Sequence, residues 1–306
     1  MIPRAQREAS PARMPSLWLE CRPLFDDPGV LEVLMNGVRS LCLLKSNGQR
    51  QLMPPLFSNA DLMLRSIQDF VHHQGLRLDP FCPGQGGTFS DDTVKEFRIR
   101  WHCVMPPVAF EAPLLSLRRH RFAQIALSQF AINPTNRERL EQWVARGRSL
   151  LITGLTGAGK TSLMVALLAQ LPPEERVIIL EQVSEIPCLG EAWIKLVAQG
   201  ANFEGRGAFA MDRLLEEALR LRPDRMVLGE IRGGEAAVLV RTALTGHHGI
   251  MATVHARSAS EAHLRLKNLM PPSGRADCVE ALAMFATAVV ERGSPPRIIE
   301  VDYPET

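Results

Sequence analysis

The sequence predicts an α/β protein in which a smaller α+β domain precedes a domain built on a parallel sheet covered by helices. With 306 residues, and about 150 residues per domain as a guide, the chain is long enough for two domains. The second half alternates apolar runs with amphipathic stretches, which is typical of a parallel sheet covered on both faces. The first half has short apolar runs separated by Asn-Gly pairs, which favours strands joined by tight turns.

The first half predicts the elements of the smaller domain. Val30 to Met35 and Leu41 to Leu44 are expected to be strands, because Asn36-Gly37 between them favours a turn. The prolines between residues 106 and 134 interrupt both helices and strands, so the domain boundary is expected among them. The other expected elements are a helix from Asn59 to His73, a glycine and proline loop from Pro80 to Gly87, and an extended segment from Phe97 to Met105.

The second half predicts six strands with helices between them. Helices are expected over Gly159 to Leu171, over Met211 to Leu221, and after the capping box Ser258 to Glu261, since each has apolar residues on one face and a clear start or stop signal. The expected strands are Ser149 to Thr153, Arg176 to Glu181, Arg225 to Gly229, Ile250 to His255, Ala286 to Glu291 and Arg297 to Val301.

Composition excludes several classes of protein. Lys plus Arg number 35 against 33 Asp plus Glu, so no net field favours nucleic acid or an anionic membrane as the partner. The six cysteines form no Cys-x-x-Cys pair, which argues against a zinc ribbon or a redox dithiol and favours reduced, cytosolic thiols. No stretch reaches the roughly 18 apolar residues of a membrane span, and no signal peptide is expected.

One motif carries specific chemistry. The segment from Gly154 to Thr161 matches G-x-x-x-x-G-K-[ST] directly after an expected strand and directly before a helix, which is the context of a phosphate-binding P-loop. Lys160 is expected on the β- and γ-phosphate oxygens of ATP, and the Thr161 hydroxyl on Mg²⁺. The nucleotide-binding residues are expected to be Gly154, Leu155, Thr156, Gly157, Ala158, Gly159, Lys160, Thr161 and Ser162.

Polar residues that follow other strands are candidates for the same site. Glu230 follows the strand at Arg225, where a carboxylate would orient Mg²⁺ or accept the proton of the attacking water; a solvated strand-end residue is the alternative. Glu181 and Glu185 follow another strand and are expected near the same cleft. His255 ends a further strand and is either a sensor of the nucleotide or a structural residue.

Arginines flank the proline-rich stretch. Arg100 and Arg118 belong to a group that also includes Arg98, Arg119 and Arg121. A planar guanidinium binds phosphate oxygens well, but most surface arginines are solvated, so both interpretations stay open at this point.

These segments resemble the type II/type IV secretion and pilus ATPase superfamily, and most closely its Tad-pilus and conjugation branches. Residues 176–186 are similar to the family's Asp box, although Gln182 stands where an acid is usual. Residues 219–236 are similar to its Walker B region almost throughout, and residues 245–256 resemble its His box. Arg100, residues 105–107 and residues 115–119 resemble the edge of its amino-terminal domain.

The resemblance implies a RecA-like P-loop ATPase domain and assigns the roles. The implied catalytic residues are Glu230, Lys160, His255, Glu181, Glu185, Arg118 and Arg100, with Thr161 and Glu230 on the metal and ATP with Mg²⁺ as the cofactors. The implied domains are a flexible segment at residues 1–20, an α+β domain at 21–121, a linker at 122–136 and the ATPase domain at 137–306.

The resemblance also implies an assembly. A homohexameric ring motor would power pilus assembly or protein secretion through an inner-membrane platform protein. It would act from the cytoplasmic face of the bacterial inner membrane, to which partner proteins would attach it. Nucleic acid is not expected as a partner. Gln182 and Gln199, where relatives often place an acid and an arginine, keep a second hypothesis open: a nucleotide-binding scaffold or regulatory paralogue with weak hydrolysis. A P-loop motor that acts on nucleic acid is a further alternative, and a small-molecule kinase is a more distant one.

Overall fold

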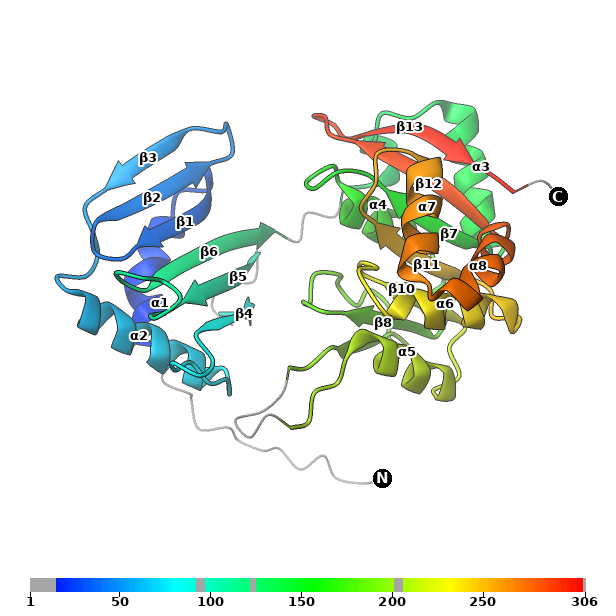
Figure 1. The fold of residues 1–306 in the computed structure, drawn as a ribbon. Coiled ribbons are helices and arrows are strands. Elements are labelled where there is room, and N and C mark those ends of the chain that lie inside the picture. Colours follow the sequence, from blue (N-terminus) through cyan, green and yellow to red (C-terminus); the bar gives the residue numbers. More distant parts are fainter. Residues whose placement is uncertain (1–14, 92–96, 122–124, 201–205, 305–306) are drawn as a thin grey trace, which may run out of the picture. The chain divides into compact units, whose positions relative to one another are not determined.

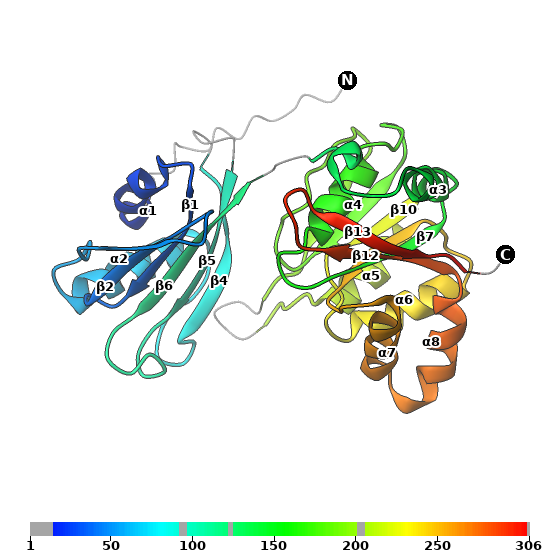
Figure 2. The same ribbon diagram turned by 90° about the horizontal axis from the view of Figure 1, so that it is seen from above.

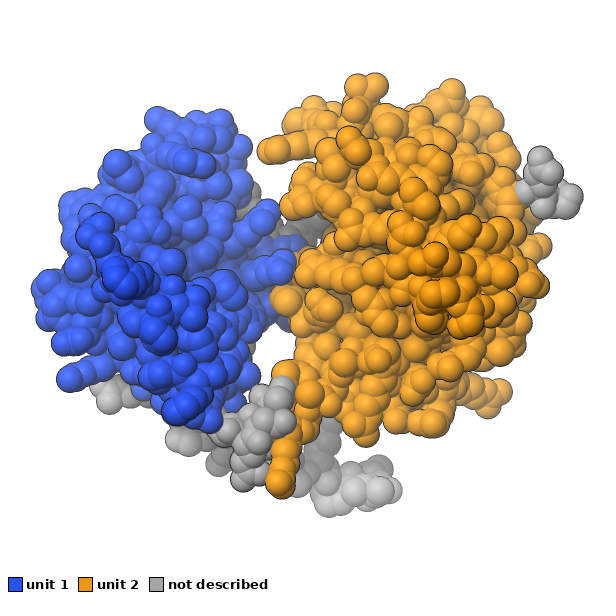
Figure 3. Space-filling view, in the orientation of Figure 1, with its two compact units in different colours: residues 1–121 blue, residues 122–306 orange. Residues whose placement is uncertain are grey.

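The structure is a computed structural model that describes residues 15–91, 97–121, 125–200 and 206–304. The chain forms two compact units, residues 1–121 and residues 122–306, shown in two colours in Figure 3. Each unit has its own sheet and its own hydrophobic core. Within the described ranges, no helix has both the length and the apolar character that crossing a bilayer requires.

Unit 1 is an antiparallel sheet with helices on one face. Its elements are α1 (Ser16–Cys21), the 3-10 helix η1 (Arg22–Phe25), β1 (Val30–Asn36), β2 (Ser40–Lys45), β3 (Arg50–Met53), α2 (Ala60–His73), β4 (Gly84–Phe89), β5 (Phe97–Val104) and β6 (Leu114–Arg121). The six strands lie in the order β3-β2-β1-β6-β5-β4 (Figure 1). Alternate residues of the strands, such as Ile99 and Trp101, pack with α1 and α2 in a single core.

Two expectations for unit 1 are wrong in detail. Residues 16–20 are not a flexible segment, because they belong to α1, where Leu17 and Trp18 are buried and the Trp18 Nε1–H donates to Asp91 Oδ2 at 2.8 Å. Residues 1–14, the rest of that expected segment, lie outside the described residues.

The glycine and proline loop expected over Pro80 to Gly87 is also partly wrong, because β4 begins at Gly84. Glycine serves close packing here: a Cβ on Gly86 would lie 2.7 Å from His102 Nδ1, and a Cβ on Gly87 would lie 3.2 Å from the Trp101 ring. A turn-like composition therefore belongs to a strand in which the neighbouring strand packs closely against Gly86 and Gly87.

Unit 2 is built on a mostly parallel sheet. The elements are η2 (Leu127–Gln129), α3 (Pro134–Ala145), β7 (Ser149–Thr153), α4 (Lys160–Leu168), β8 (Val177–Glu181), β9 (Ile194–Val197), α5 (Met211–Arg220), β10 (Arg225–Leu228), α6 (Glu235–Leu244), β11 (Ile250–Val254), α7 (Ala259–Leu269), η3 (Pro272–Gly274), α8 (Arg275–Leu282), β12 (Phe285–Glu291) and β13 (Arg297–Asp302). The seven strands lie in the order β13-β12-β7-β11-β10-β8-β9, and β12–β13 is the antiparallel pair among them.

Helices cover both faces of this sheet. Ile178 and Leu180 of β8 point into a core with α5, α6, α7 and α8, whereas Val177 and Ile179 point into a core with α3 and α4. Figure 2 shows α3 and α4 on one side of the sheet and α7 and α8 on the other. The predicted α/β class, with a smaller α+β domain before a parallel-sheet domain, is confirmed.

The segment that follows the boundary between the units packs on unit 2. Leu127 and Phe130 are buried in its core, and α3 begins at Pro134, inside the range expected as a linker. The Ala131 N–H donates to the Pro296 carbonyl at 2.9 Å, and the Ile298 N–H donates to the Ala131 carbonyl at 3.0 Å. The hairpin of β12 and β13 therefore holds this segment by backbone hydrogen bonds.

Candidate active site

The P-loop connects β7 to α4 and is shaped by glycines. A Cβ on Gly154 would overlap the backbone oxygen of Val290 in β12, so only glycine fits there. Gly159, the N-cap of α4, has φ +103°, and a Cβ on it would lie 3.2 Å from Pro296. The loop thus lies against the β12–β13 hairpin, and its amides precede the amino end of a helix, where anions are favoured.

Lys160 is positioned by the same loop. Its Nζ donates to the carbonyls of Gly154 at 2.9 Å and of Leu155 at 3.1 Å. Burial lowers the pKa of Lys160, and the negative charge of Glu230 partly opposes that effect. A phosphate would favour the charged amine, since it supplies the negative charge that the buried ammonium lacks. Thr161 and Ser162 lie half-buried in the first turn of α4.

Glu230 lies two residues after the end of β10, at the edge of the sheet where the P-loop follows β7. Its Oε2 is 2.5 Å from Arg232 Nη2 in an ion pair whose side chains are 31% and 48% exposed, respectively. The charges of Glu230 and Arg232 both act on the ammonium group of Lys160. The structure therefore brings Glu230, Arg232 and Lys160 into one electrostatic neighbourhood.

Glu235 is a site residue that the sequence reasoning missed. It is the first residue of α6, it is 4% exposed, and its Oε1 accepts the backbone N–H groups of Arg232 at 2.5 Å and Gly233 at 2.9 Å. An acidic residue at the start of a helix after two glycines was the available signal. Its partners are backbone amides, which no sequence pattern specifies.

Glu181 and Glu185 follow β8. Glu181 is 2% exposed, and its Oε1 accepts the backbone N–H groups of Glu185 at 2.9 Å and Ile186 at 2.8 Å. Burial raises the pKa of Glu181, although the Lys195 ammonium, 3.4 Å from its Oε2, acts in the opposite direction. In this structure Glu181 organises its own loop, and Glu185 lies close enough for its charge to act on Arg232.

His255 lies beside the P-loop. Its Nδ1 is 3.4 Å from Thr156 Oγ1, and its carbonyl accepts a hydrogen bond from Arg265 Nη1 at 3.0 Å. The contact with Thr156 joins the carboxyl end of the β11 segment to the loop after β7. The structure thus places the His255 ring beside the P-loop, and its role as a sensor of the nucleotide stays a prediction.

Arg100 and Arg118 belong to unit 1, whereas the P-loop belongs to unit 2. They are directly opposite each other in the β5–β6 ladder, and both side chains are exposed. The structure thus places these two arginines together on one sheet face.

The residues of the described ranges include no group of three His, Cys, Asp or Glu side chains that could hold a metal ion. Mg²⁺ at a nucleotide is held largely by phosphates and water, with one or two protein oxygens. Thr161 and Glu230 are of the right chemistry for that smaller share, so the donor set fits a metal that arrives with the nucleotide.

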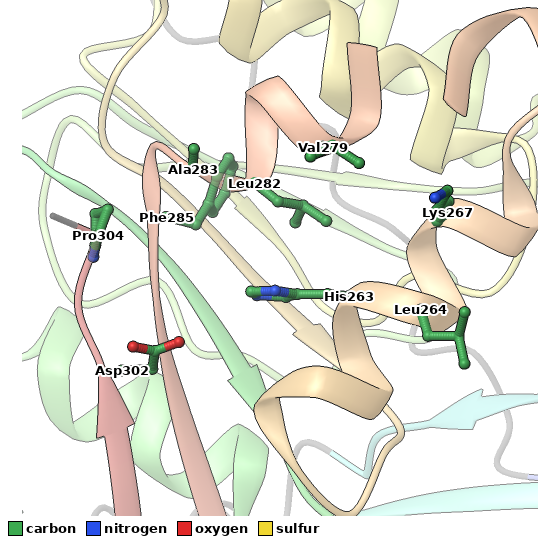
Figure 4. A pocket seen from close by; sticks show the side chains of 9 residues that line it. All are labelled: His263, Leu264, Lys267, Val279, Leu282, Ala283, Phe285, Asp302 and Pro304. Atoms are coloured by element: carbon green, nitrogen blue, oxygen red, sulfur yellow. The ribbon is translucent and has the colours of Figure 1, made fainter. Parts of the chain in front are cut away.

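A separate hollow of about 330 Å³ lies away from the P-loop, at the end of the sheet where β12 begins and β13 ends. Figure 4 shows His263 of α7 between Leu264 and Lys267 on one side and Phe285 and Asp302 on the other. His263 Nε2 is 2.9 Å from the Thr287 hydroxyl. This hollow contains none of the residues expected at the nucleotide site.

His263 predicts a pH dependence of stability. Burial lowers its pKa, with the Asp302 charge acting in the opposite direction, so the folded protein resists protonation of this ring. The unfolded chain binds that proton near its ordinary pKa of about 6.5, so stability falls as pH drops through that value. When the pH is lowered from about 7.5 to about 5.5, the thermal midpoint of the wild type is expected to fall. The midpoint of His263→Gln is expected to fall by about 2–4 °C less. Equal losses in both proteins would contradict a role for His263.

The parallel sheet, the P-loop between β7 and α4, and a carboxylate after β10, the next strand but one in the sheet, define a P-loop ATPase. Residues 85–288 match the family model described as type II/IV secretion system protein. The chain belongs to this family of secretion ATPases, as the resemblance predicted.

Several relatives and solved structures are similar to the chain. A putative conjugal transfer protein of Mycobacterium tuberculosis is 36% identical over 251 residues, which cover 81% of this chain and 71% of that protein. The conjugal transfer protein TrbB of Rhizobium radiobacter is 30% identical over 216 residues, or 67% of this chain and 64% of TrbB. The pilus retraction motor PilT with bound ADP has a TM-score of 0.68 at 17% identity, over 94% of this chain and 83% of that one. The ATPase DotB of Legionella pneumophila has a TM-score of 0.68 at 14% identity, over 90% and 76%.

Proposed function

We propose that the protein is a homohexameric ring motor whose ATP hydrolysis powers pilus assembly or protein secretion through an inner-membrane platform protein. Membership of the secretion ATPase family supports this proposal, as do relatives described as conjugal transfer proteins. The observation that carries the hydrolytic part is the joint position of Lys160 and Glu230, whose charges act on each other at one edge of the sheet.

The P-loop binds the phosphates in this mechanism. Backbone amides of residues 154–161 surround the β-phosphate, and Lys160 leaves its two carbonyl partners to contact the β- and γ-phosphate oxygens. Exchange of neutral carbonyls for phosphate oxygens strengthens the contacts of the amine, because charge-assisted hydrogen bonds are the stronger kind. Binding energy from the phosphates therefore orders the loop around its ligand.

Hydrolysis requires a proton acceptor and a stabilised γ-phosphate. Glu230 orients the attacking water and accepts its proton, while Lys160 stabilises the charge that develops on the transferred group. Thr161 and Glu230 would supply the protein oxygens for an Mg²⁺ that arrives with the nucleotide, and the bound ion would offset negative charge of the phosphates. His255, through Thr156, senses the state of the loop.

Unit 1 contributes cations in this proposal. Arg100 and Arg118, paired across β5 and β6, supply guanidinium groups to the nucleotide as the two domains close on it. Hydrolysis and phosphate loss remove the negative charge that draws them in, so the domains reopen. Repeated closure and opening in a ring is the motion that would act on a platform protein.

The test combines steady-state ATP hydrolysis with particle mass from light scattering, with and without ATP and Mg²⁺. We expect hydrolysis from a particle of about six subunits, and its loss both in Lys160→Ala and on chelation of Mg²⁺. A particle that binds nucleotide without turnover would instead favour the scaffold hypothesis. That hypothesis is supported by the neutral Gln182, which stands where the family's Asp box usually has an acid. Salt-sensitive binding of single-stranded nucleic acid would favour the nucleic-acid motor.

A further inference from the structure

Arg232, in the turn after β10, connects several polar residues by hydrogen bonds. Glu230, Arg232 and Glu235 lie within one turn that connects β10 to α6, and Gln182 approaches from the loop after β8. Of these four residues, the mechanism above uses Glu230 alone. Arg232 pairs with the Glu230 carboxylate, and Gln182 and Glu235 are connected to that carboxylate through Arg232.

Glu235 fixes the backbone from which Arg232 extends. Its buried Oε1 accepts the N–H groups of both Arg232 and Gly233, and the neighbouring Ile231 N–H donates to the Thr253 carbonyl of β11 at 2.9 Å. The turn is thus held by hydrogen bonds on both sides of Arg232. The guanidinium therefore starts from a fixed point, and its reach is limited by its own side chain.

That guanidinium has two side-chain neighbours of unequal charge. Nη2 is 2.5 Å from Glu230 Oε2, and Nη1 is 3.5 Å from Gln182 Oε1. An acid at position 182, as the family's Asp box usually has, would share the guanidinium with Glu230. In this chain the neutral Gln182 leaves Glu230 as the carboxylate in the ion pair.

The ion pair restrains the carboxylate that the proposed hydrolysis uses. While Nη2 contacts Oε2 of Glu230, the guanidinium takes up one of its acceptor positions and fixes the direction in which the carboxylate points. The pair is also exchangeable, because both side chains are partly exposed and such pairs are weak. Arg232 follows the carboxyl end of β10 and Lys160 follows the carboxyl end of β7, so both residues lie at the same side of one parallel sheet. The Arg232 charge also acts on the Lys160 ammonium.

We infer that Arg232 is a positioning residue that holds Glu230 in the nucleotide-free site and exchanges this carboxylate for the γ-phosphate when ATP binds. The fork of a guanidinium matches phosphate oxygens as well as carboxylate oxygens, so the exchange replaces one charge-assisted contact with another. Glu230 is then free to receive the water. The inference rests on the proposed function and adds that ATP, and not ADP, breaks the resting ion pair.

The test measures the affinities of a non-hydrolysable ATP analogue and of ADP by titration calorimetry. Arg232→Gln is expected to weaken the analogue about tenfold and to change ADP less than about twofold, because ADP lacks the γ-phosphate. Glu230→Gln is expected to strengthen the analogue about three- to tenfold, since no ion pair has to be broken. Gln182→Glu, which offers the guanidinium a second carboxylate, is expected to weaken the analogue.

A double-mutant cycle separates this exchange from simple charge repulsion. With Arg232→Gln already present, Glu230→Gln is expected to leave the affinity for the analogue unchanged. If Glu230→Gln strengthens binding equally in both backgrounds, repulsion between carboxylate and phosphate explains the effect and the inference is overturned. Equal losses of ADP and analogue in Arg232→Gln would overturn it too, because the γ-phosphate would then play no part.

Matched controls distinguish this failure from failure of the proposed function. Arg241→Gln breaks another exposed ion pair of unit 2, with Glu216 at 2.9 Å, and is expected to leave both affinities unchanged. Arg232→Lys keeps the charge without the fork and is expected to lie between Arg232→Gln and the wild type. A wild type that binds neither nucleotide would refute the proposed function and the inference together, whereas hydrolysis with an additive cycle would refute the inference alone.

Discussion

Replacement of Glu230 by glutamine is expected to lower kcat for ATP hydrolysis by about 1,000-fold without weakening ATP binding. Glutamine has nearly the same shape as glutamate but cannot accept a proton from water at neutral pH, and general base catalysis typically contributes about 100- to 10,000-fold. Nucleotide contacts of Lys160 and the P-loop amides do not involve this oxygen. Steady-state hydrolysis and nucleotide titration on the same preparation measure the two effects.

Glu216→Gln is the matched control, since it makes the same chemical change at an exposed glutamate of unit 2 that pairs with Arg241. It is expected to retain full turnover. Retained turnover in Glu230→Gln would remove this residue from the role of base. The next candidates for the base would then be Glu181 and Glu185, the other carboxylates that follow a strand at this side of the sheet.

Gly154→Ala is expected to abolish nucleotide binding and to destabilise unit 2 by about 2–4 kcal/mol. The added methyl group would overlap the Val290 carbonyl and approach Ala158 Cβ to 3.2 Å, and a backbone oxygen of the β12–β13 ladder cannot move aside cheaply. The loop would have to leave the β12–β13 hairpin, and the amides that bind phosphate would lose their arrangement. Urea unfolding and nucleotide titration measure both effects.

Gly157→Ala provides a comparison within the same loop. Its Cβ would meet no atom within 4 Å, so the cost is the positive φ of +73° alone, about 1–2 kcal/mol. We therefore expect the Gly154 variant to be clearly less stable than the Gly157 variant. Equal destabilisation would show that backbone conformation, and not the contact with Val290, restricts Gly154 to glycine.

Much of the fold could be predicted because its signals are local. Buried parallel strands such as β7 and β11 are continuous apolar runs, and α7 follows a capping box that the structure retains, with Ser258 accepting from the Glu261 N–H. Strand β9 was not predicted, because it is a short edge strand that is only partly buried. Strand β4 was hidden by glycines whose role depends on Trp101 and His102, far along the chain.

The candidate site divides in the same way. The P-loop is contiguous in sequence, and Glu230 follows a recognisable strand, so both could be proposed from the residues alone. The contacts of Glu181 and Glu235 with backbone amides depend on how each turn folds, and residue types do not encode them. The pairing of Arg100 with Arg118 depends on strand register, which a shift of one residue would have abolished.

The β12–β13 hairpin gives the nucleotide loop a mechanical connection. Pro296 lies against Gly159 on one side, and its carbonyl accepts the Ala131 N–H on the other. Ala131 lies shortly after the boundary of unit 1, so two backbone hydrogen bonds tie this segment to the hairpin, in addition to the burial of Leu127 and Phe130 in the core of unit 2. The segment that follows unit 1 and the loop that would hold the nucleotide therefore meet at one short turn, so a change in either is expected to reach the other through the backbone of that turn.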